Sequence, residues 1–204
     1  MIDATLLPLQ RAMLRSPAAA LAARGVRADQ VTLAGFSIGI LAIPALALHA
    51  YWLALVLILR NRLADGLDGA IARINGPTDR GAFLDIALDF LFYALIPVGF
   101  ALADPGRNAL AASVLIAAFV GTGSSFLAFA SIAAKRGLSA QSYPSKGIYY
   151  LGGLTEGAET ILFFAAICVF PNAFPLLAYL FAMACGVTTL TRWLMGWRAF
   201  SETE

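Results

Sequence analysis

Residues 61–90 read NRLADGLDGAIARINGPTDRGAFLDIALDF, and they place four aspartates within two largely apolar segments. Asp65 and Asp68 are three residues apart and Asp85 and Asp89 are four apart, so each pair lies on one face of its helix. The short loop between the segments makes the two helices antiparallel neighbours. Counting back from this loop places the carboxylates roughly 6 to 15 Å along their helices, so all four can share one layer.

The composition is that of a membrane protein. Of the 204 residues, 60% are hydrophobic and only 13% are charged, and the mean hydropathy is +0.80. These charges are too few to coat a soluble surface, which excludes a soluble enzyme. The net charge of +2 provides no broad cationic face, so nucleic acid is excluded as a partner. Cys168 and Cys185 lie in apolar runs and are interpreted as core residues.

Several apolar runs have about the length that a helix needs to cross a bilayer. They cover residues 31–48, 51–74, 81–102, 109–134, 147–170 and 174–197. We therefore predict an all-α membrane protein with six transmembrane helices, preceded by a short amphipathic interfacial helix. The predicted organisation is an N-terminal amphipathic, juxtamembrane segment (1–30), a six-helix transmembrane catalytic domain (31–199) and a cytoplasmic tail (200–204).

The interfacial helix is predicted from the N-terminal pattern, in which apolar residues recur at helical spacing between polar ones. A frayed terminus is the alternative. The apolar positions are Leu6, Leu9, Met13 and Leu14.

Basic residues predict the orientation, because they concentrate on the cytoplasmic side of membrane proteins. They precede the first span, flank the second-to-third and fourth-to-fifth loops and follow the last span, whereas Arg107 is alone on the other side. Both termini are thus predicted to be cytoplasmic, with the aspartate layer opening to the cytoplasmic leaflet. Abundant Ala, and Arg in excess of Lys, favour a bacterial source and its cytoplasmic membrane.

Glycines spaced four residues apart allow close contact between membrane helices. Gly35 and Gly39 form one such pair, and Gly153 and Gly157 form another. Each pair indicates either internal packing or a dimer seam.

The four aspartates require bound positive charge. An acidic side chain at membrane depth costs about 2.5 to 3.5 kcal/mol on insertion scales. Hard divalent cations prefer oxygen ligands, and two Mg²⁺ ions match four carboxylates. Small neighbouring residues leave space for a bulky ligand, which points to phosphate; they are Gly66, Gly69, Ala70 and Ala72. The alternative is a purely structural ionic network with Arg60, Arg62, Arg73 and Arg80.

The spacing of these residues resembles the signature of the CDP-alcohol phosphotransferases, membrane enzymes that build phospholipids from a CDP-linked donor. The matching positions are Asp65-x-x-Asp68-Gly69-x-x-Ala72-Arg73 and then Gly81-x-x-x-Asp85-x-x-x-Asp89. Seven residues separate Arg73 from Gly81, where the family usually has eight. This difference falls in a loop, which can absorb a deletion.

The resemblance implies a two-metal site for Mg²⁺ or Mn²⁺. Asp65, Asp68 and Asp85 would be metal ligands, and Asp89 would be both a ligand and the general base. Residues that would hold the CDP donor are Gly69, Ala72, Arg73, Thr78, Asp29 and Thr32. Asp29 and Ala28 stand where an Asn and a Pro are expected. The resemblance also implies a homodimer.

The implied reaction transfers a phosphatidyl group from CDP-diacylglycerol to an alcohol and releases CMP. Paired metals can neutralise charge on the pyrophosphate while Asp89 takes the proton of the acceptor hydroxyl. A CDP-choline or CDP-ethanolamine donor is one alternative. A cation- or proton-coupled transporter and a non-catalytic membrane scaffold are others, although transporters commonly show internal repeats that this sequence lacks.

The acceptor alcohol is left open between glycerol phosphate, serine, another polyol and a lipid hydroxyl. Gly157 and Thr160 stand where family members that use inositol phosphate have arginines, which argues against that acceptor. Candidate acceptor residues are Lys135, Arg136, Lys146, Glu156 and Glu159. The basic residues among them could instead set the topology, and the glutamates could instead pair with Arg192.

Overall fold

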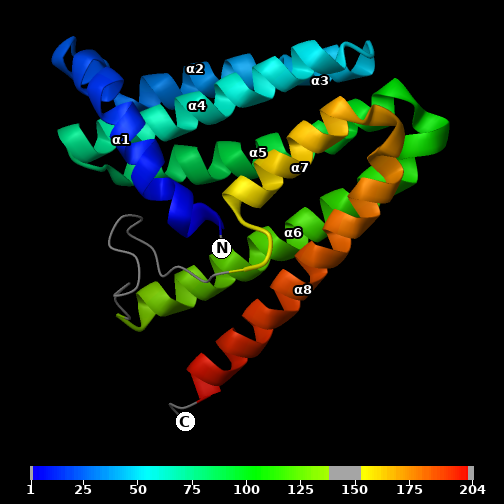
Figure 1. Cartoon of the computed structure of the whole chain (residues 1–204). Coiled ribbons are helices and arrows are strands. Elements are labelled where there is room, and N and C mark those ends of the chain that lie inside the picture. Colours follow the sequence, from blue (N-terminus) through cyan, green and yellow to red (C-terminus); the bar gives the residue numbers. More distant parts are fainter. Residues whose placement is uncertain (1, 138–152, 202–204) are drawn as a thin grey trace.

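A computed structural model describes residues 2–137 and 153–201, which form helices and turns with no strand among them (Figure 1). The helices before the first gap are α1 (Ile2–Ala23), α2 (Ala28–Ile40), α3 (Ala42–Ala47), α4 (Tyr51–Asn75), α5 (Asp79–Ala103) and α6 (Pro105–Lys135). After the gap come α7 (Gly157–Val169), the short 3-10 helix η1 (Pro171–Ala173) and α8 (Phe174–Ser201).

Four segments of the described chain are long and apolar enough to cross a membrane. They are α2 with α3 (Ala28–Ala47), α5, α6, and η1 with α8 (Pro171–Ser201). Apolar α7 is shorter, and α4 has the length of α5 but carries charged residues along its second half. The all-α membrane class is therefore confirmed, whereas a full set of six spans stays a prediction.

The first predicted span, 31–48, differs from the structure. It begins earlier, at Ala28, and it is divided into α2 and α3 by a turn at Leu41. Pro44 accounts for the break, because a proline has no N–H to donate to the carbonyl of Ile40 one turn before it.

The fifth predicted span, 147–170, also needs correction. Its first part, residues 147–152, lies outside the described residues, and residues 153–156 are not helical. The helix begins only at Gly157, because Glu156 caps it. The Glu156 side chain accepts from the backbone N–H of Glu159, and the Glu156 N–H donates to Glu159 Oε2 at 3.2 Å. This reciprocal capping defines the start of a helix.

The remaining predicted segments agree with helices of the structure to within four residues. The largest differences are in α6, which begins at Pro105, four residues before the predicted 109, and in α8, which ends at Ser201, four residues after the predicted 197. Proline fits the first position of a helix, and Asp104 accepts the Arg107 N–H at 3.2 Å to cap it.

The main core joins α3, α5, α6, α7 and α8 with the first half of α4. Phe92, Phe100, Phe164 and Phe174 are fully buried there, and the Phe100 and Phe174 rings stack with centroids 4.4 Å apart. Since α4 contributes its N-terminal half and α5 its C-terminal half, this core occupies the end of both helices opposite to the aspartates.

Helix α1 lies across α4 in Figure 1 and packs against its C-terminal half. Leu14 and Ala18 are buried with Ala70 and Ile71 of α4, whereas Met13 is exposed. This part of α1 is therefore a packed helix and not a frayed end, while its position at the membrane surface stays a prediction.

Three of the paired glycines serve internal packing. A Cβ atom on Gly35 would lie 2.5 Å from the Cβ of Ala64, and one on Gly39 would lie 2.8 Å from the Cβ of Asn61. A side chain on Gly153 would likewise collide with Thr188 of α8. Gly35, Gly39 and Gly153 therefore allow close contacts within the protein.

Candidate active site

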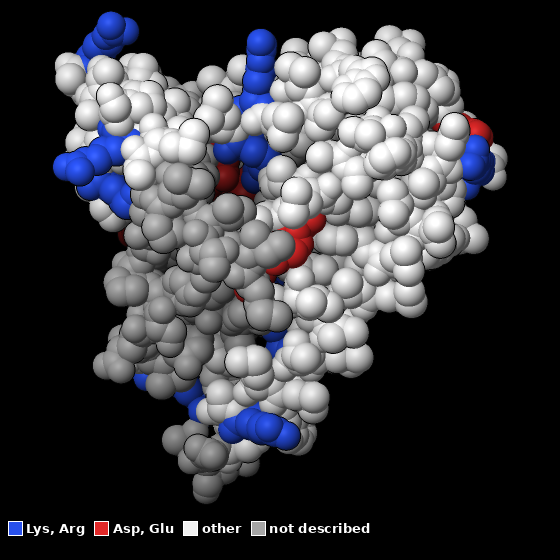
Figure 2. All heavy atoms as spheres, in the orientation of Figure 1, with Lys and Arg blue, Asp and Glu red and all other residues white. Residues whose placement is uncertain are grey.

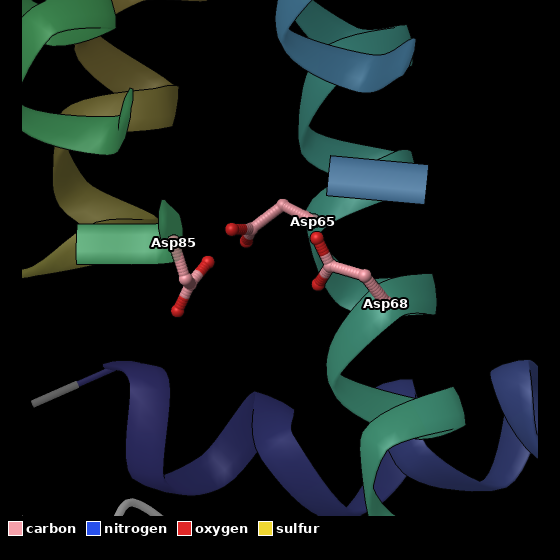
Figure 3. A group of neighbouring side chains, drawn as sticks. All are labelled: Asp65, Asp68 and Asp85. Atoms are coloured by element: carbon pink, nitrogen blue, oxygen red, sulfur yellow. The ribbon is translucent and has the colours of Figure 1, made fainter. Parts of the chain in front are cut away.

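Three aspartates from two neighbouring helices converge on one point (Figure 3). Asp65 and Asp68 extend from α4 and Asp85 from α5, and their carboxylate oxygens lie within 4.8 Å of one another. Asp68 is buried, with 5% of its surface exposed. We call these three residues the aspartate cluster, and it confirms that the two aspartate-bearing faces meet.

The loop between α4 and α5 positions this cluster. Gly76, with a φ of +91°, ends α4, because a left-handed backbone is easily adopted by glycine. Thr78 then caps α5 by accepting the Gly81 N–H at 3.1 Å. The tight reversal brings α5 back beside α4 with Asp85 opposite Asp65 and Asp68.

Helix α2 contributes the two residues predicted from its N-terminal segment. Thr32 donates a hydrogen bond to Asp68 Oδ2 at 2.5 Å, so it contacts the cluster directly. Asp29 instead forms an ion pair with Arg80, whose Nε donates at 2.8 Å. Asp29 also lies beside Thr78, because oxygens of both are 3.1 Å from where a Gly81 Cβ would be.

The other predicted donor residues occupy the last turns of α4, next to Asp68. Ala72 is half-buried and Arg73 is exposed. Gly69 faces Arg73, whose guanidinium nitrogen is 3.5 Å from the position of a Cβ on Gly69. A Cβ at this position would make only an ordinary van der Waals contact with Arg73, so Gly69 and Arg73 lie side by side without crowding.

Asp89 is held by an arginine beside the cluster. Arg62 donates to both carboxylate oxygens of Asp89, at 2.6 and 3.2 Å, and lies 3.8 Å from Asp65. Arg62, Asp65, Asp68 and Asp89 line one small pocket together with Thr32. Asp89 thus shares the site of the other aspartates, but its carboxylate is engaged by Arg62.

Two polar residues of this region were not identified from the sequence. Asn61 accepts from Arg62 Nε at 2.8 Å, and the Tyr93 hydroxyl accepts from Arg62 at 3.1 Å. Tyr93 could have been identified from the sequence, because it follows Asp89 by four residues and so shares its helix face. Asn61 is buried at 4% exposure, which requires hydrogen-bond partners.

The candidate acceptor residues are spread over other elements. Glu156 and Glu159 form the cap of α7 described above, while Lys135 is the last residue of α6. Arg136 donates to the Phe200 carbonyl at 3.1 Å and lies over its ring. Those contacts direct Arg136 toward the end of α8, and Lys146 lies outside the described residues.

Charge is unevenly distributed over the molecule. In Figure 2 most of the visible surface is uncharged, and acidic atoms lie recessed in a hollow near its centre. Arg62 brings one positive charge to Asp65 and Asp89. Three carboxylates as close as those of the cluster have the oxygen donors that hard divalent cations prefer, so the site fits such ions.

The family model for CDP-alcohol phosphatidyltransferases matches residues 26–198 of this chain. The chain belongs to this family. The match includes α2 and every aspartate of the site, so it confirms the resemblance carried by the motif.

Relatives of known name support this membership. The chain is 54% identical over 204 residues to the inner membrane protein YnjF of Escherichia coli K12, spanning all of this chain and 99% of the relative. It is 39% identical over 83 residues to the archaetidylinositol phosphate synthase of Pyrococcus horikoshii, spanning 40% and 44% of the two chains. With its apolar helices, this phosphatidyltransferase-family chain is an integral membrane protein.

Solved structures share the fold. Phosphatidylinositol phosphate synthase (PgsA1) of Mycobacterium tuberculosis, crystallised with manganese and citrate, superposes with a TM-score of 0.71 at 22% identity over 90% of this chain and 88% of that one. A second structure of that enzyme, with CDP-DAG bound, gives 0.66 at 23% identity, over 90% and 93%. Manganese is thus found in a protein of this fold, and the aspartate cluster is the described group in this chain that could bind such an ion.

Proposed function

We propose that this protein transfers a phosphatidyl group from CDP-diacylglycerol to an alcohol acceptor and releases CMP. The observation that carries the proposal is the aspartate cluster, in which carboxylates of two helices meet within 4.8 Å in a member of this family. Membrane location supports a lipid-linked donor, because its acyl chains can stay in the bilayer while its nucleotide reaches the site from water.

Asp65, Asp68, Asp85 and Asp89 would hold two divalent cations, Mg²⁺ or Mn²⁺. Such ions supply charge neutralisation at the pyrophosphate and polarise the phosphorus under attack. Thr32 would orient Asp68 through its hydrogen bond of 2.5 Å, and Asp65 and Asp85 would approach from opposite helices. This arrangement fits a ligand that bridges α4 and α5.

Asp89 is proposed as the general base. With 30% of its side chain exposed, Asp89 is accessible to the hydroxyl of an acceptor. Its carboxylate would take the proton of that hydroxyl while the hydroxyl oxygen attacks phosphorus and CMP leaves.

The donor site is proposed to lie along the N-terminal ends of α2 and α5 and the C-terminal turns of α4. A phosphate there would meet the helix termini and the guanidinium of Arg73. Its residues are Asp29, Thr32, Gly69, Ala72, Arg73 and Thr78.

The acceptor pocket is proposed to involve Lys135, Arg136, Lys146, Glu156 and Glu159. In α7, Glu156 and Glu159 already act as caps, so they would shape the pocket while fixing the start of that helix. Glycerol phosphate, serine, another polyol and a lipid hydroxyl are the acceptor candidates, because Gly157 and Thr160 offer no cation for inositol phosphate.

We further propose the membrane arrangement expected from the sequence. It consists of an interfacial segment (1–30), a six-span catalytic domain (31–199) and a cytoplasmic tail (200–204), in a bacterial cytoplasmic membrane. Both termini would be cytoplasmic, the site would open to the cytoplasmic leaflet, and the protein would act as a homodimer.

CMP release tests the proposal directly. Detergent-purified protein is given CDP-diacylglycerol with Mn²⁺ or Mg²⁺ and a panel of alcohols, and CMP is quantified. We expect release with one acceptor and none when Asp65, Asp68 and Asp85 are all changed to Asn. A parallel arm with CDP-choline identifies the alternative donor, and absence of release with every donor from folded protein would contradict the proposal.

A further inference from the structure

Arg62 is a buried arginine placed between the two aspartate pairs. Its side chain is 10% exposed, and it donates to both oxygens of Asp89 while lying 3.8 Å from Asp65. A guanidinium that binds both oxygens of a carboxylate fixes its plane as well as its position.

Arg62 is itself fixed from several sides. Its Nε donates to Asn61, and the Asn61 amide in turn donates to the Gly35 carbonyl of α2 at 3.1 Å. The Tyr93 hydroxyl accepts from the same guanidinium, whose central carbon lies 5.2 Å from the ring centroids of both Phe92 and Tyr93. The contacts therefore form a continuous connection from the backbone of α2 through α4 to α5.

We infer that Arg62 is a positioning residue that holds the Asp89 carboxylate in place for proton transfer from the acceptor alcohol. The inference rests on the proposed function. In that step the acceptor O–H bond breaks and its proton moves to Asp89, the acceptor oxygen bonds to phosphorus, and the bond from phosphorus to the CMP oxygen breaks. Arg62 stays protonated throughout and acts only through Asp89.

The geometry explains why an arginine is needed. The Asp89 carboxylate has to keep a fixed position beside the aspartate cluster to accept the proton. A misplacement of about 1 Å can lower the rate by a factor of about 100. Lysine offers a single ammonium that cannot bind both oxygens in a plane. We therefore predict that charge alone will not replace Arg62.

The kinetic test compares Arg62→Gln and Arg62→Lys with the wild type in CMP release. We expect kcat to fall about 100-fold in Arg62→Gln and to recover only partly in Arg62→Lys. The KM for CDP-diacylglycerol should change less than about threefold, because Arg62 is proposed to contact Asp89 and not the donor. Arg60→Gln is the matched control, since it removes the same charge from an exposed position of the same helix and should leave kcat unchanged.

Two readouts separate this inference from the proposed function. Arg62→Gln should bind Mn²⁺ no more weakly than the wild type, because all four aspartates remain and a positive charge beside Asp65 and Asp89 is removed. Arg62→Gln and Asp89→Asn should each lower the midpoint of thermal unfolding, and the double variant should lower it by less than the sum, because both remove one interaction. This coupling is measurable even in a protein that releases no CMP.

Three results would overturn the inference. Unchanged kcat in Arg62→Gln would show that Asp89 needs no positioning, and a raised KM with unchanged kcat would place Arg62 on the substrate. Fully additive shifts in thermal unfolding would show that Arg62 and Asp89 do not interact. Failure of wild-type CMP release alongside a clear coupling would instead contradict the proposed function and leave the contact established.

Discussion

The two ends of α4 and α5 differ sharply although they belong to the same pair of helices. At one end, Ile58 of α4 and Phe92, Ile96 and Phe100 of α5 are completely buried. At the other end, Asp65 and Asp89 keep about a third of their side chains exposed, at 34% and 30%. The backbone is helical throughout, so side-chain chemistry alone makes one end a packed core and the other a polar site.

The two ends are also held together in different ways. The apolar end is joined by ring contacts, such as Tyr51 of α4 stacked on Phe100 of α5, that depend on shape and burial. At the polar end the contacts are hydrogen bonds and ion pairs, including Thr32 with Asp68 and Arg62 with Asp89. We infer that the buried apolar end supplies most of the stability. At the polar end the carboxylates repel one another, and this arrangement provides the oxygen ligands that the proposed reaction needs.

Replacing the proposed base should produce the largest effect and should act on the polar end alone. Asp89→Asn should lower kcat for CMP release by about 10³-fold, because general-base catalysis contributes factors of about 10² to 10⁴. Circular dichroism should show an unchanged helix content. Asp79→Asn is the control, because Asp79 is an exposed carboxylate of the same helix. Substantial turnover in Asp89→Asn would remove Asp89 from its role.

A core substitution should have the opposite profile. Phe100→Ala should lower the free energy of unfolding by about 3 to 5 kcal/mol, because it leaves a cavity at a fully buried site. Turnover per folded molecule should stay close to that of the wild type, as should Mn²⁺ affinity. Unfolding in detergent measures the first quantity and CMP release the second, and a large loss of kcat in folded Phe100→Ala would show that the two ends are not separable.

Removal of one metal ligand should weaken ion binding with little effect on the core. Asp85→Asn should raise the Kd for Mn²⁺ by at least about 10-fold, since even partners of metal ligands contribute factors of about 10 to 100. Titration followed by Mn²⁺ electron paramagnetic resonance measures the affinity, and Asp79→Asn again serves as the control. Equal affinity in the two variants would place the ion elsewhere.

The smallest effect is expected at the edge of the polar end. Arg80 pairs with Asp29 but is 69% exposed, and such surface pairs contribute about 0 to 1 kcal/mol. Arg80→Gln should therefore leave the thermal midpoint within about 4 °C of the wild type. A larger drop would show that the contact between α2 and α5 is part of the stable core.

Helix periodicity and the short loop were sufficient to predict much of the site. The spacing of Asp65 and Asp68 fixed one face of α4, and the tight reversal at Gly76 brought α5 beside it. The motif also identified the family, which the match over residues 26–198 confirms. These features are local, so the sequence determines them directly.

The features that escaped prediction depend on distances between helices or on local capping. The sequence offered Arg62 as one of several arginines that could pair with the aspartates. Which carboxylate Arg62 binds depends on how closely α4 and α5 approach, and the spacing of residues along one helix does not determine this distance. The break at Leu41 and the late start of α7 follow from Pro44 and Glu156. Both residues lie in apolar segments, so the prediction from hydropathy treated each segment as one continuous helix. Hydropathy located most of the apolar helices to within four residues but did not show the break at Leu41 or the start of α7 at Gly157.

Whether the aspartate cluster binds the ion that supports the reaction is tested by measuring Mn²⁺ binding and CMP release in the same preparation of wild-type protein. Metal-free protein is titrated with Mn²⁺ in the presence of CDP-diacylglycerol and the productive acceptor. We predict that CMP release is absent without the ion and rises with occupancy, and that both are lost together when the aspartate cluster is changed to Asn. Release in the absence of divalent cations, or release that persists without the cluster, would contradict the account.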